Sequence, residues 1–192
     1  SMLNSITNQK IERLNSVSTI ADGIAVKEPG IHTYDICNKY VDGIVTVTDD
    51  EISTAILTLI EQQKLIAEGA GAVSVAAAMF NKVPVKGKKV ICLVSGGNID
   101  VTILSRVINR GLLKTGRSYT LTVELADRPG QLVGVTGIIA RMGATVISVH
   151  HERAGSKDIT GCYLQVVMET RNHEHIEKIR QELIREGYHV IS

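Results

Sequence analysis

The sequence predicts an α/β protein built in two unlike parts. In residues 1–114, short β-branched runs alternate with helical repeats, which is typical of a sheet with helices on both faces. In residues 118–192, apolar and polar residues alternate along each predicted strand, which indicates a sheet with one face toward solvent. The polar, glycine-containing stretch 115–117 is expected to be the linker between the two parts.

Composition narrows the classes of function. The 192 residues are 44% hydrophobic and 21% charged, and the net charge of +1 gives no strong field for nucleic acid or an anionic membrane. Aromatic residues make up only 3%, too few for base-stacking surfaces. The most apolar helical stretch, 70–80, is shorter than the roughly 20 residues that a membrane span needs. We therefore expect no nucleic-acid partner and no membrane partner.

The three cysteines indicate the cellular compartment of the protein. Cys37, Cys92 and Cys162 are widely spaced and form no C-x-x-C pair. An odd number of such cysteines is typical of reduced, buried thiols in a cytoplasmic protein, which is the location we expect.

The first part is expected to contain half of a sheet. Strands are predicted at 23–26, 43–47, 65–67 and 88–94, and helices follow a capping box at Thr48 and Glu51, an alanine-rich run from residue 70, and residues 99–113. So few strands around a fully apolar run leave edges unpaired, and proteins normally cover such edges.

The run 88–94 ends in a short polar, glycine-rich loop. Ligands bind at the carboxyl ends of strands in open α/β sheets, and glycines let a backbone approach a ligand closely. Taken alone, a plain loop between strand and helix explains this pattern at least as well. The loop residues are Ser95, Gly96, Gly97 and Asn98.

The second part reads as a complete unit. Strands at 119–125, 145–149, 162–168 and 190–191 alternate with helices at 132–142 and 172–186, which gives the order βαββαβ of a ferredoxin-like fold. The second strand, 145–149, is expected near a sheet edge.

The turn after the first of these strands is a candidate binding site. Gly130 and the amide groups of Gln131 and Leu132 open a helix and could receive a carboxylate, while Asp127 would suit an ammonium group. Ser148 is expected to form a wall of this pocket across a partner subunit. The turn is needed whether or not anything binds, so a purely oligomerising module stays an open alternative.

No metal site is expected. His150 and His151 are neighbours on a strand and so face opposite sides, and no cysteine or acidic residue has ligand spacing around them. These two histidines, together with His173 and His175, are expected to be exposed.

Three motifs in the first part resemble the later portion of threonine dehydratases, also called threonine ammonia-lyases. The motifs are S-T-I-A-D-G-I-A-V at 18–26, E-G-A-G-A at 68–72 and V-S-G-G-N at 94–98. These enzymes use pyridoxal phosphate and have the tryptophan-synthase-β-like fold, fold type II. Residues 118–192, with D-R-P-G at 127–130, resemble an ACT domain, a small regulatory module that binds amino acids.

The resemblance assigns roles to the first part. Ser95 would lie at the pyridine nitrogen of the cofactor, Gly96 and Gly97 would let the backbone pass close to its ring, and Asn98 completes the motif. Gly23 would lie beside the cofactor. Glu68 would lie at the rim of the pocket, although a charge favoured by the helix dipole is an equal explanation. Gly69 and Gly71 are at least as well explained by packing.

The family's S-F-K-x-R-G motif, whose lysine carries the cofactor, and its tetraglycine loop do not occur in this chain. We therefore expect no catalytic residue here, and an isolated chain that is inactive and does not hold pyridoxal phosphate.

The resemblance implies conversion of L-threonine to 2-oxobutanoate and ammonia by the parent enzyme. The ACT domain would sense isoleucine or valine and pair into a homo-oligomer. Two alternatives remain: a non-enzymatic amino-acid sensor of the ACT type, and an enzyme resembling serine dehydratases or racemases.

Overall fold

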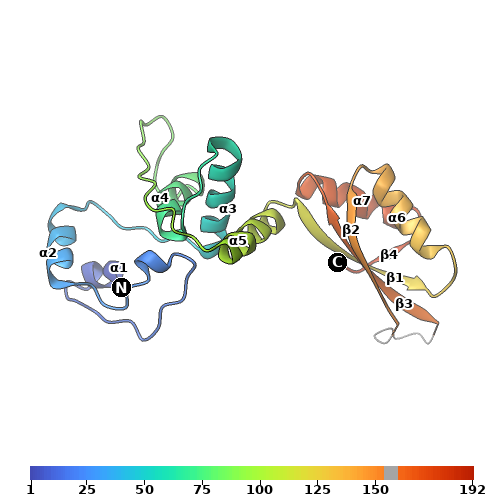
Figure 1. The fold of residues 1–192 in the computed structure, drawn as a ribbon, viewed down its shortest axis with the longest axis horizontal. Helices are drawn as coiled ribbons and strands as arrows, with labels where there is room; N and C mark the ends of the chain where they lie inside the picture. Colours follow the sequence, from blue (N-terminus) through green and yellow to red (C-terminus); the bar gives the residue numbers. More distant parts are fainter. Residues whose placement is uncertain (154–159) are drawn as a thin grey trace. The chain divides into compact units, whose positions relative to one another are not determined.

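The computed structural model describes residues 1–153 and 160–192, which form two compact units, Ser1–Gly111 and Leu112–Ser192 (Figure 1). Helix α5 (Val101–Lys114) runs through the point at which the units divide.

The first unit is built from helices. In chain order they are α1 (Met2–Thr7), the 3₁₀ turn η1 (Asp22–Ile24), α2 (Ile31–Tyr40), α3 (Asp49–Thr58), the π turn η2 (Leu59–Gln63), α4 (Gly69–Met79) and α5. Its core forms where α3 packs on α4, around the fully buried side chains of Ala55, Ile56, Ala72 and Ala76.

The predicted helix signals are confirmed. The hydroxyl of Thr48 accepts the Glu51 amide, and the Glu51 carboxylate accepts the Thr48 amide, so the capping box starts α3 as expected. The helix predicted at 99–113 is α5, which spans Val101–Lys114.

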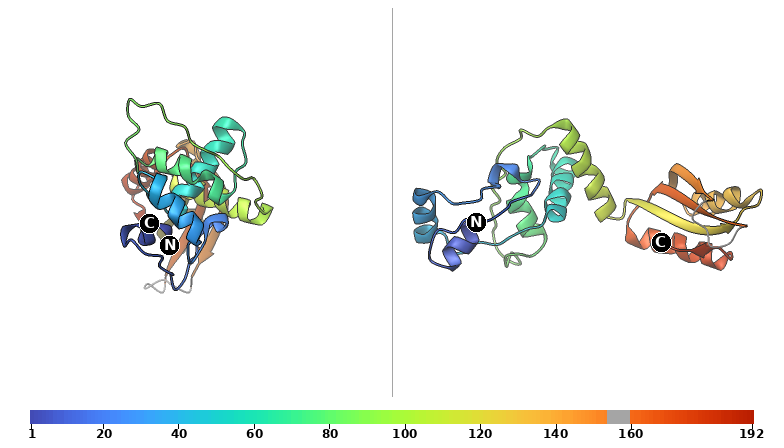
Figure 2. Two further views of the ribbon diagram at one scale, coloured as in Figure 1. Left: turned by 90° about the vertical axis from the view of Figure 1, so that its left-hand side faces the viewer. Right: turned by 90° about the horizontal axis from the view of Figure 1, so that it is seen from below.

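The four strands predicted in this unit are not formed in the part of the chain that the structure describes. Residues 22–24 form a 3₁₀ turn, and the whole stretch between α4 and α5 runs without a strand (Figures 1 and 2). A strand exists only through ladder hydrogen bonds to a neighbour, and none is available here. Accordingly Ile91 is 97% exposed and Leu93 is 77% exposed, although both belong to the apolar run that ends at Val94.

The second unit has the predicted βαββαβ order. Its elements are β1 (Ser118–Ala126), α6 (Gln131–Arg141), β2 (Thr145–Glu152), β3 (Gly161–Glu169), α7 (His173–Arg185) and β4 (His189–Val190). The antiparallel sheet has the strand order β2-β3-β1-β4, so β2 is an edge strand as predicted.

One face of this sheet carries the core. Every second residue of β1 and β3 is buried, and the register places Leu121 opposite Val166, Val123 opposite Leu164 and Leu125 opposite Cys162. Val135, Ile139, Ile179 and Leu183 from α6 and α7 complete the cluster. The period of two in the sequence therefore sets the buried face.

Residues 115–117 are hydrogen-bonded into the second unit. The Arg117 amide donates to the Leu112 carbonyl, and the Thr170 amide donates to the Arg117 carbonyl. The Thr170 hydroxyl donates to the Gly116 carbonyl at 2.5 Å, and Gly116 has a φ of +68°. This segment is therefore held by several hydrogen bonds.

Two predictions about buried residues are wrong. His175 was expected to be exposed but is only 3% exposed, because its ring accepts the Arg171 amide and bonds the Met142 carbonyl. Cys37 and Cys92 were expected to be buried but are half-buried, and Cys162 is buried as expected.

Candidate functional site

Three segments that are distant in the sequence meet around Glu68. Glu68 is the N-cap residue of α4, its amide donates to the Gly96 carbonyl at 3.2 Å, and its carboxylate accepts the Asn98 amide at 3.3 Å. A Cβ on Gly23 would lie 3.3 Å from the same carboxylate. We call Gly23, Glu68 and residues 95–98 the glycine-loop cluster.

Glycine is required at several points of this cluster. A Cβ on Gly96, whose φ is +80°, would lie 2.3 Å from the Glu68 carboxyl carbon. A Cβ on Gly71 would lie 1.8 Å from the Ser95 carbonyl oxygen, and one on Gly69 would lie 2.2 Å from the Ile20 carbonyl oxygen. Packing thus accounts for Gly69 and Gly71, the explanation that the sequence left open.

The predicted cofactor residues therefore lie together, and they face outward. Ser95, Gly96, Gly97 and Asn98 are all exposed. An exposed hydroxyl beside glycine backbone fits one edge of a flat ring such as that of pyridoxal phosphate, because the hydroxyl can bond a ring atom while the backbone approaches closely. The Glu68 carboxylate orients this loop through the Asn98 amide.

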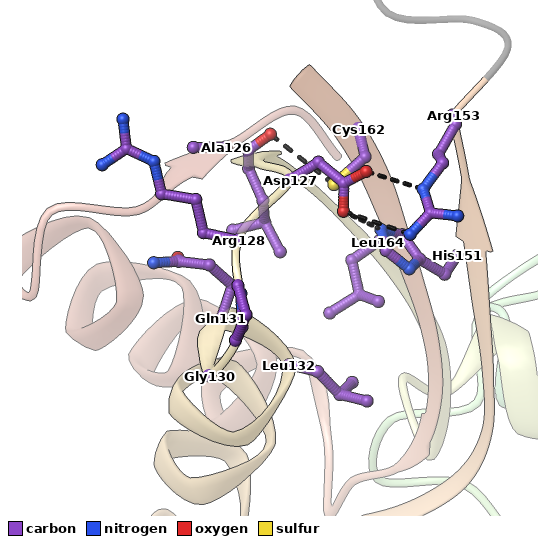
Figure 3. Close-up of a pocket in the computed structure, with 12 residues that line it drawn as sticks. Ala126, Asp127, Arg128, Gly130, Gln131, Leu132, His151, Arg153, Cys162 and Leu164 are labelled. Atoms are coloured by element: carbon purple, nitrogen blue, oxygen red, sulfur yellow. Dashed lines mark hydrogen bonds and ion pairs between the residues drawn. The ribbon is translucent and has the colours of Figure 1, made fainter. Parts of the chain in front are cut away.

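The second unit contains a pocket of about 420 Å³ at the end of β1 (Figure 3). Leu125, Leu132 and Leu164 supply apolar walls, and Asp127 lies on the polar side. Helix α6 begins at Gln131 after Gly130, whose φ of +90° lets the chain turn there. Of the predicted effector residues, the pocket brings together Asp127, Gly130, Gln131 and Leu132.

Asp127 is held by a bidentate ion pair. The Arg153 guanidinium donates to its two carboxylate oxygens at 2.6 and 3.4 Å, and the His151 Nε2 atom lies 3.8 Å away. The hydrogen bond from Arg153 keeps the pKa of Asp127 below its usual value, and the same contact raises the pKa of Arg153.

Cys162 lies at the inner side of this pocket. Its thiol donates weakly to the Leu125 carbonyl at 3.6 Å. Burial raises the pKa of this thiol, with a smaller contribution from the Asp127 charge.

His151, Arg153 and Cys162 were missed as pocket residues in the sequence. No cysteine or acidic residue has ligand spacing around His150 and His151 in the sequence, yet in the structure ligand atoms of Asp127, His151 and Cys162 all lie within 4.8 Å of one another. Antiparallel pairing is the reason: β3 places Cys162 opposite Leu125 of β1, and places Leu164 opposite His151 of β2. The signal in the sequence is the alternation along β1 and β3. When these two strands are aligned as neighbours, their alternating residues indicate this cluster.

Ser148 lies apart from this pocket. It is exposed on edge strand β2, opposite Val167, beyond an irregularity in the register that follows Val146. Its predicted role in the wall of the pocket would need a second copy of the chain and stays a prediction.

The profile of the family described as pyridoxal-phosphate dependent enzyme matches residues 1–96, and that of the ACT domain matches residues 119–187. An L-threonine ammonia-lyase of Thermotoga maritima is 47% identical, with 99% of this chain and 47% of that protein covered. An L-threonine ammonia-lyase of Geobacter sulfurreducens is 42% identical, with coverage of 96% and 46%.

A solved structure shows a similar fold. The processed form of threonine deaminase isoform 2 from Solanum lycopersicum matches with a TM-score of 0.53 and 34% identity, over 57% of this chain and 33% of that one.

The chain belongs to the pyridoxal-phosphate dependent enzyme family, and its second unit contains an ACT domain. More particularly, the two L-threonine ammonia-lyases match it through both parts, so the predicted resemblance to the C-terminal part of a threonine dehydratase is confirmed, as is the α/β fold class. The chain spans about half the length of the curated relatives it matches.

Across the described residues, we find no helix that combines the length and apolarity of a membrane span.

Proposed function

We propose that this chain is the ACT-bearing part of an L-threonine ammonia-lyase, which converts L-threonine to 2-oxobutanoate and ammonia. The observation that carries the proposal is the glycine-loop cluster, in which the residues matched to the cofactor motifs converge from three segments. Relatives named for this activity and similar over nearly the whole chain support it.

Pyridoxal phosphate, when bound, supplies an electron sink for the carbon from which the α-proton leaves. Ser95 would offer its hydroxyl to the ring nitrogen, and a neutral hydroxyl does not hold a proton there as a carboxylate does. Glu68 would keep this loop in place through the Asn98 amide. The isolated chain lacks the family's lysine and phosphate-binding loop and is proposed to be inactive and free of cofactor.

The pocket at the end of β1 is the proposed effector site. A free amino acid is a zwitterion, and the Asp127–Arg153 pair offers one partner for each of its charges. The first amides of α6 add donors for the carboxylate, and Leu125, Leu132 and Leu164 suit a branched aliphatic side chain. Isoleucine or valine is therefore the proposed effector, with homo-oligomers formed through edge strand β2.

The test uses the full-length enzyme that contains this chain. Threonine deamination is measured with and without isoleucine and valine, in the parent enzyme, in Arg153→Gln and in Arg141→Gln. Arg141 is an exposed arginine that pairs with Glu186 outside the pocket. Loss of a charged hydrogen bond predicts an effector concentration at half-response about tenfold higher in Arg153→Gln, and unchanged in Arg141→Gln.

Each rival function predicts a different result. No deamination of threonine or serine by the full-length enzyme would favour the non-enzymatic sensor, and a higher kcat/KM for serine would favour the serine dehydratase alternative. No response to isoleucine or valine in any of the three proteins would favour a purely oligomerising ACT module, and an equal response in all three would contradict the placement of the effector beside Arg153.

A further inference from the structure

The pocket at the end of β1 brings together three side chains of different chemistry. Asp127 contributes a carboxylate, His151 an imidazole and Cys162 a thiol, and one ligand atom from each lies within 4.8 Å of the other two. Figure 3 shows these side chains converging from the end of β1 and from strands β2 and β3. We propose that this trio is a binding site for Zn²⁺.

The ligand types suit this ion. Zinc is held by cysteine sulfur, histidine nitrogen and carboxylate oxygen, usually four in a tetrahedron, and its bond lengths of about 2.0–2.3 Å place ligand atoms roughly 3.3–3.8 Å apart. The Asp127 carboxylate and the His151 Nε2 atom are already 3.8 Å apart. The remaining separations are at most 4.8 Å, so the exposed side chains of Asp127 and His151 need to move by about 1 Å to reach the distances that zinc requires.

The backbone places the three residues independently of the side-chain rotamers. Cys162 lies on the central strand β3, opposite Leu125 of β1, and Asp127 directly follows β1. His151 lies on β2 across from Leu164, two residues from Cys162 along the same face. The sheet register therefore fixes one ligand from each of three adjacent strands or strand ends.

Exposure and charge allow the ion to enter. The side chains of Asp127 and His151 are 33% and 42% exposed, whereas Cys162 is 1% exposed and forms the fixed inner point of the site. The thiol would give up its proton to solvent on binding, so the thiolate and carboxylate would neutralise Zn²⁺. Three protein ligands leave the fourth position of a tetrahedral zinc site to water or an incoming ligand.

Arg153 is the competitor of the metal. Its guanidinium occupies both oxygens of Asp127 in the absence of an ion. Zinc must displace this ion pair before the carboxylate can coordinate. Removal of the arginine should consequently strengthen metal binding, an effect that a purely structural role of these residues does not produce.

The experiment titrates the metal-free 192-residue chain with Co²⁺ as a spectroscopic probe and then displaces it with Zn²⁺. Coordination by Cys162 predicts a thiolate-to-cobalt charge-transfer band together with the strong visible bands of a tetrahedral site. His151→Gln should weaken cobalt binding about tenfold or more, and Cys162→Ser should abolish the charge-transfer band. Arg153→Gln should strengthen binding several-fold.

The other two cysteines provide the control. A double variant with Cys37→Ser and Cys92→Ser should keep the band at full intensity, since neither thiol belongs to the trio. The side chain of His151 is exposed, and a near-ultraviolet circular dichroism spectrum like that of the parent establishes that the His151→Gln variant is folded. Absence of the band in the parent chain, its loss in the double variant, or unchanged affinity in folded His151→Gln or in Arg153→Gln would overturn the site.

Discussion

The two units differ in how completely they bury their apolar residues. In the second unit, all four strands pair with a neighbour, and the helices cover an apolar face that includes Leu121, Val123 and Leu164. In the first unit, the apolar run within 88–94 has no ladder, and Ile91 is 97% exposed.

The difference teaches that an apolar pattern predicts a strand only where the strand's neighbours are present. Local signals such as the Thr48 capping box operate in both kinds of environment, because they need only residues three positions apart. Ladder bonds need a second segment. We expect the missing neighbours of 88–94 in the parent enzyme's remaining half, which the proposed function requires.

Hydrogen exchange on the whole chain gives the largest predicted contrast. Amides in the middle of β1 and β3 open only through unfolding of the second unit, which costs at least about 5 kcal/mol in typical domains. Val90, Ile91 and Leu93 are exposed, Cys92 is half-buried, and residues 90–93 lie outside any ladder. Mass-spectrometric exchange should show protection about a thousandfold higher in β1 and β3. Equal protection at 90–93 would show that this run finds a partner in solution.

A matched pair of leucines should differ in unfolding free energy. Leu183 of α7 is fully buried, so Leu183→Ala should cost about 2–5 kcal/mol through lost burial and the cavity left behind. Leu93 is 77% exposed, so Leu93→Ala should change stability by no more than about 0.5 kcal/mol. Urea denaturation followed by circular dichroism measures both. Ordinary surface changes alter the free energy of unfolding by roughly ±0.5 kcal/mol. A cost above about 1 kcal/mol for Leu93→Ala would therefore contradict the exposed placement of this run.

The predictable part of the fold was the part governed by local or self-contained patterns. Alternation along 119–125 and 162–168 predicted two paired strands, and the helix that begins after Asn172 was found from its cap and its periodicity. The strands of the first unit failed because nothing in the run 88–94 reports whether a neighbour is there.

The site shows the same limit. Glu68 and Asn98 meet although they lie 30 residues apart, and the family motifs that contain them predicted that both belong to the cofactor site. Arg153 directly follows β2, and its ion pair with Asp127 depends on the pairing of β2 with β3 and of β3 with β1, which no local pattern reports. His175 is buried because its ring bonds two backbone groups, an arrangement that its polar neighbours in the sequence conceal.

Two helical glycines offer a smaller contrast between the units. A methyl group on Gly71 of α4 would lie 1.8 Å from the Ser95 carbonyl oxygen. Gly71→Ala must therefore push residues 95–98 away and should lower the free energy of unfolding by about 1–3 kcal/mol. Gly137 of α6 has open space where its Cβ would be. Gly137→Ala should stabilise by roughly 0.5–1 kcal/mol through helix propensity. Thermal unfolding measures the pair, and a neutral Gly71→Ala would show that α4 does not contact the loop in solution.

Helix caps should matter about equally in the two units. Thr48 caps α3, and Asn172 caps α7 by accepting the His175 amide. Thr48→Ala and Asn172→Ala should each cost about 1 kcal/mol. Because the effect is local, chemical denaturation should show the first loss in the transition of the first unit and the second loss in that of the second unit. Loss of both in a single shared transition would show that the units unfold together.

The smallest predicted effect is on pH dependence. The pKa of Glu51 lies below its ordinary value because the Lys82 ammonium and the Thr48 amide bond the carboxylate, and the pKa of Glu174 lies below its ordinary value mainly because of Lys178. A carboxyl whose pKa is lowered by folding stabilises the protein above the unfolded pKa, and this stabilisation is lost as the pH falls through the lowered pKa. Both glutamates should therefore favour the folded state near neutral pH and cease to do so in acid.

Two lysine variants separate the contributions. Lys178→Met should return the pKa of Glu174 almost to its ordinary value, because Lys178 supplies the largest causes of the shift. Lys82→Met should leave the pKa of Glu51 still lowered, because the Thr48 amide continues to donate at 2.8 Å. Carboxyl-carbon NMR titration measures both residues in one sample. Full recovery of the Glu51 pKa in Lys82→Met would mean that the reciprocal half of the capping box is open in solution, since a backbone donor of that kind cannot be removed by changing a lysine.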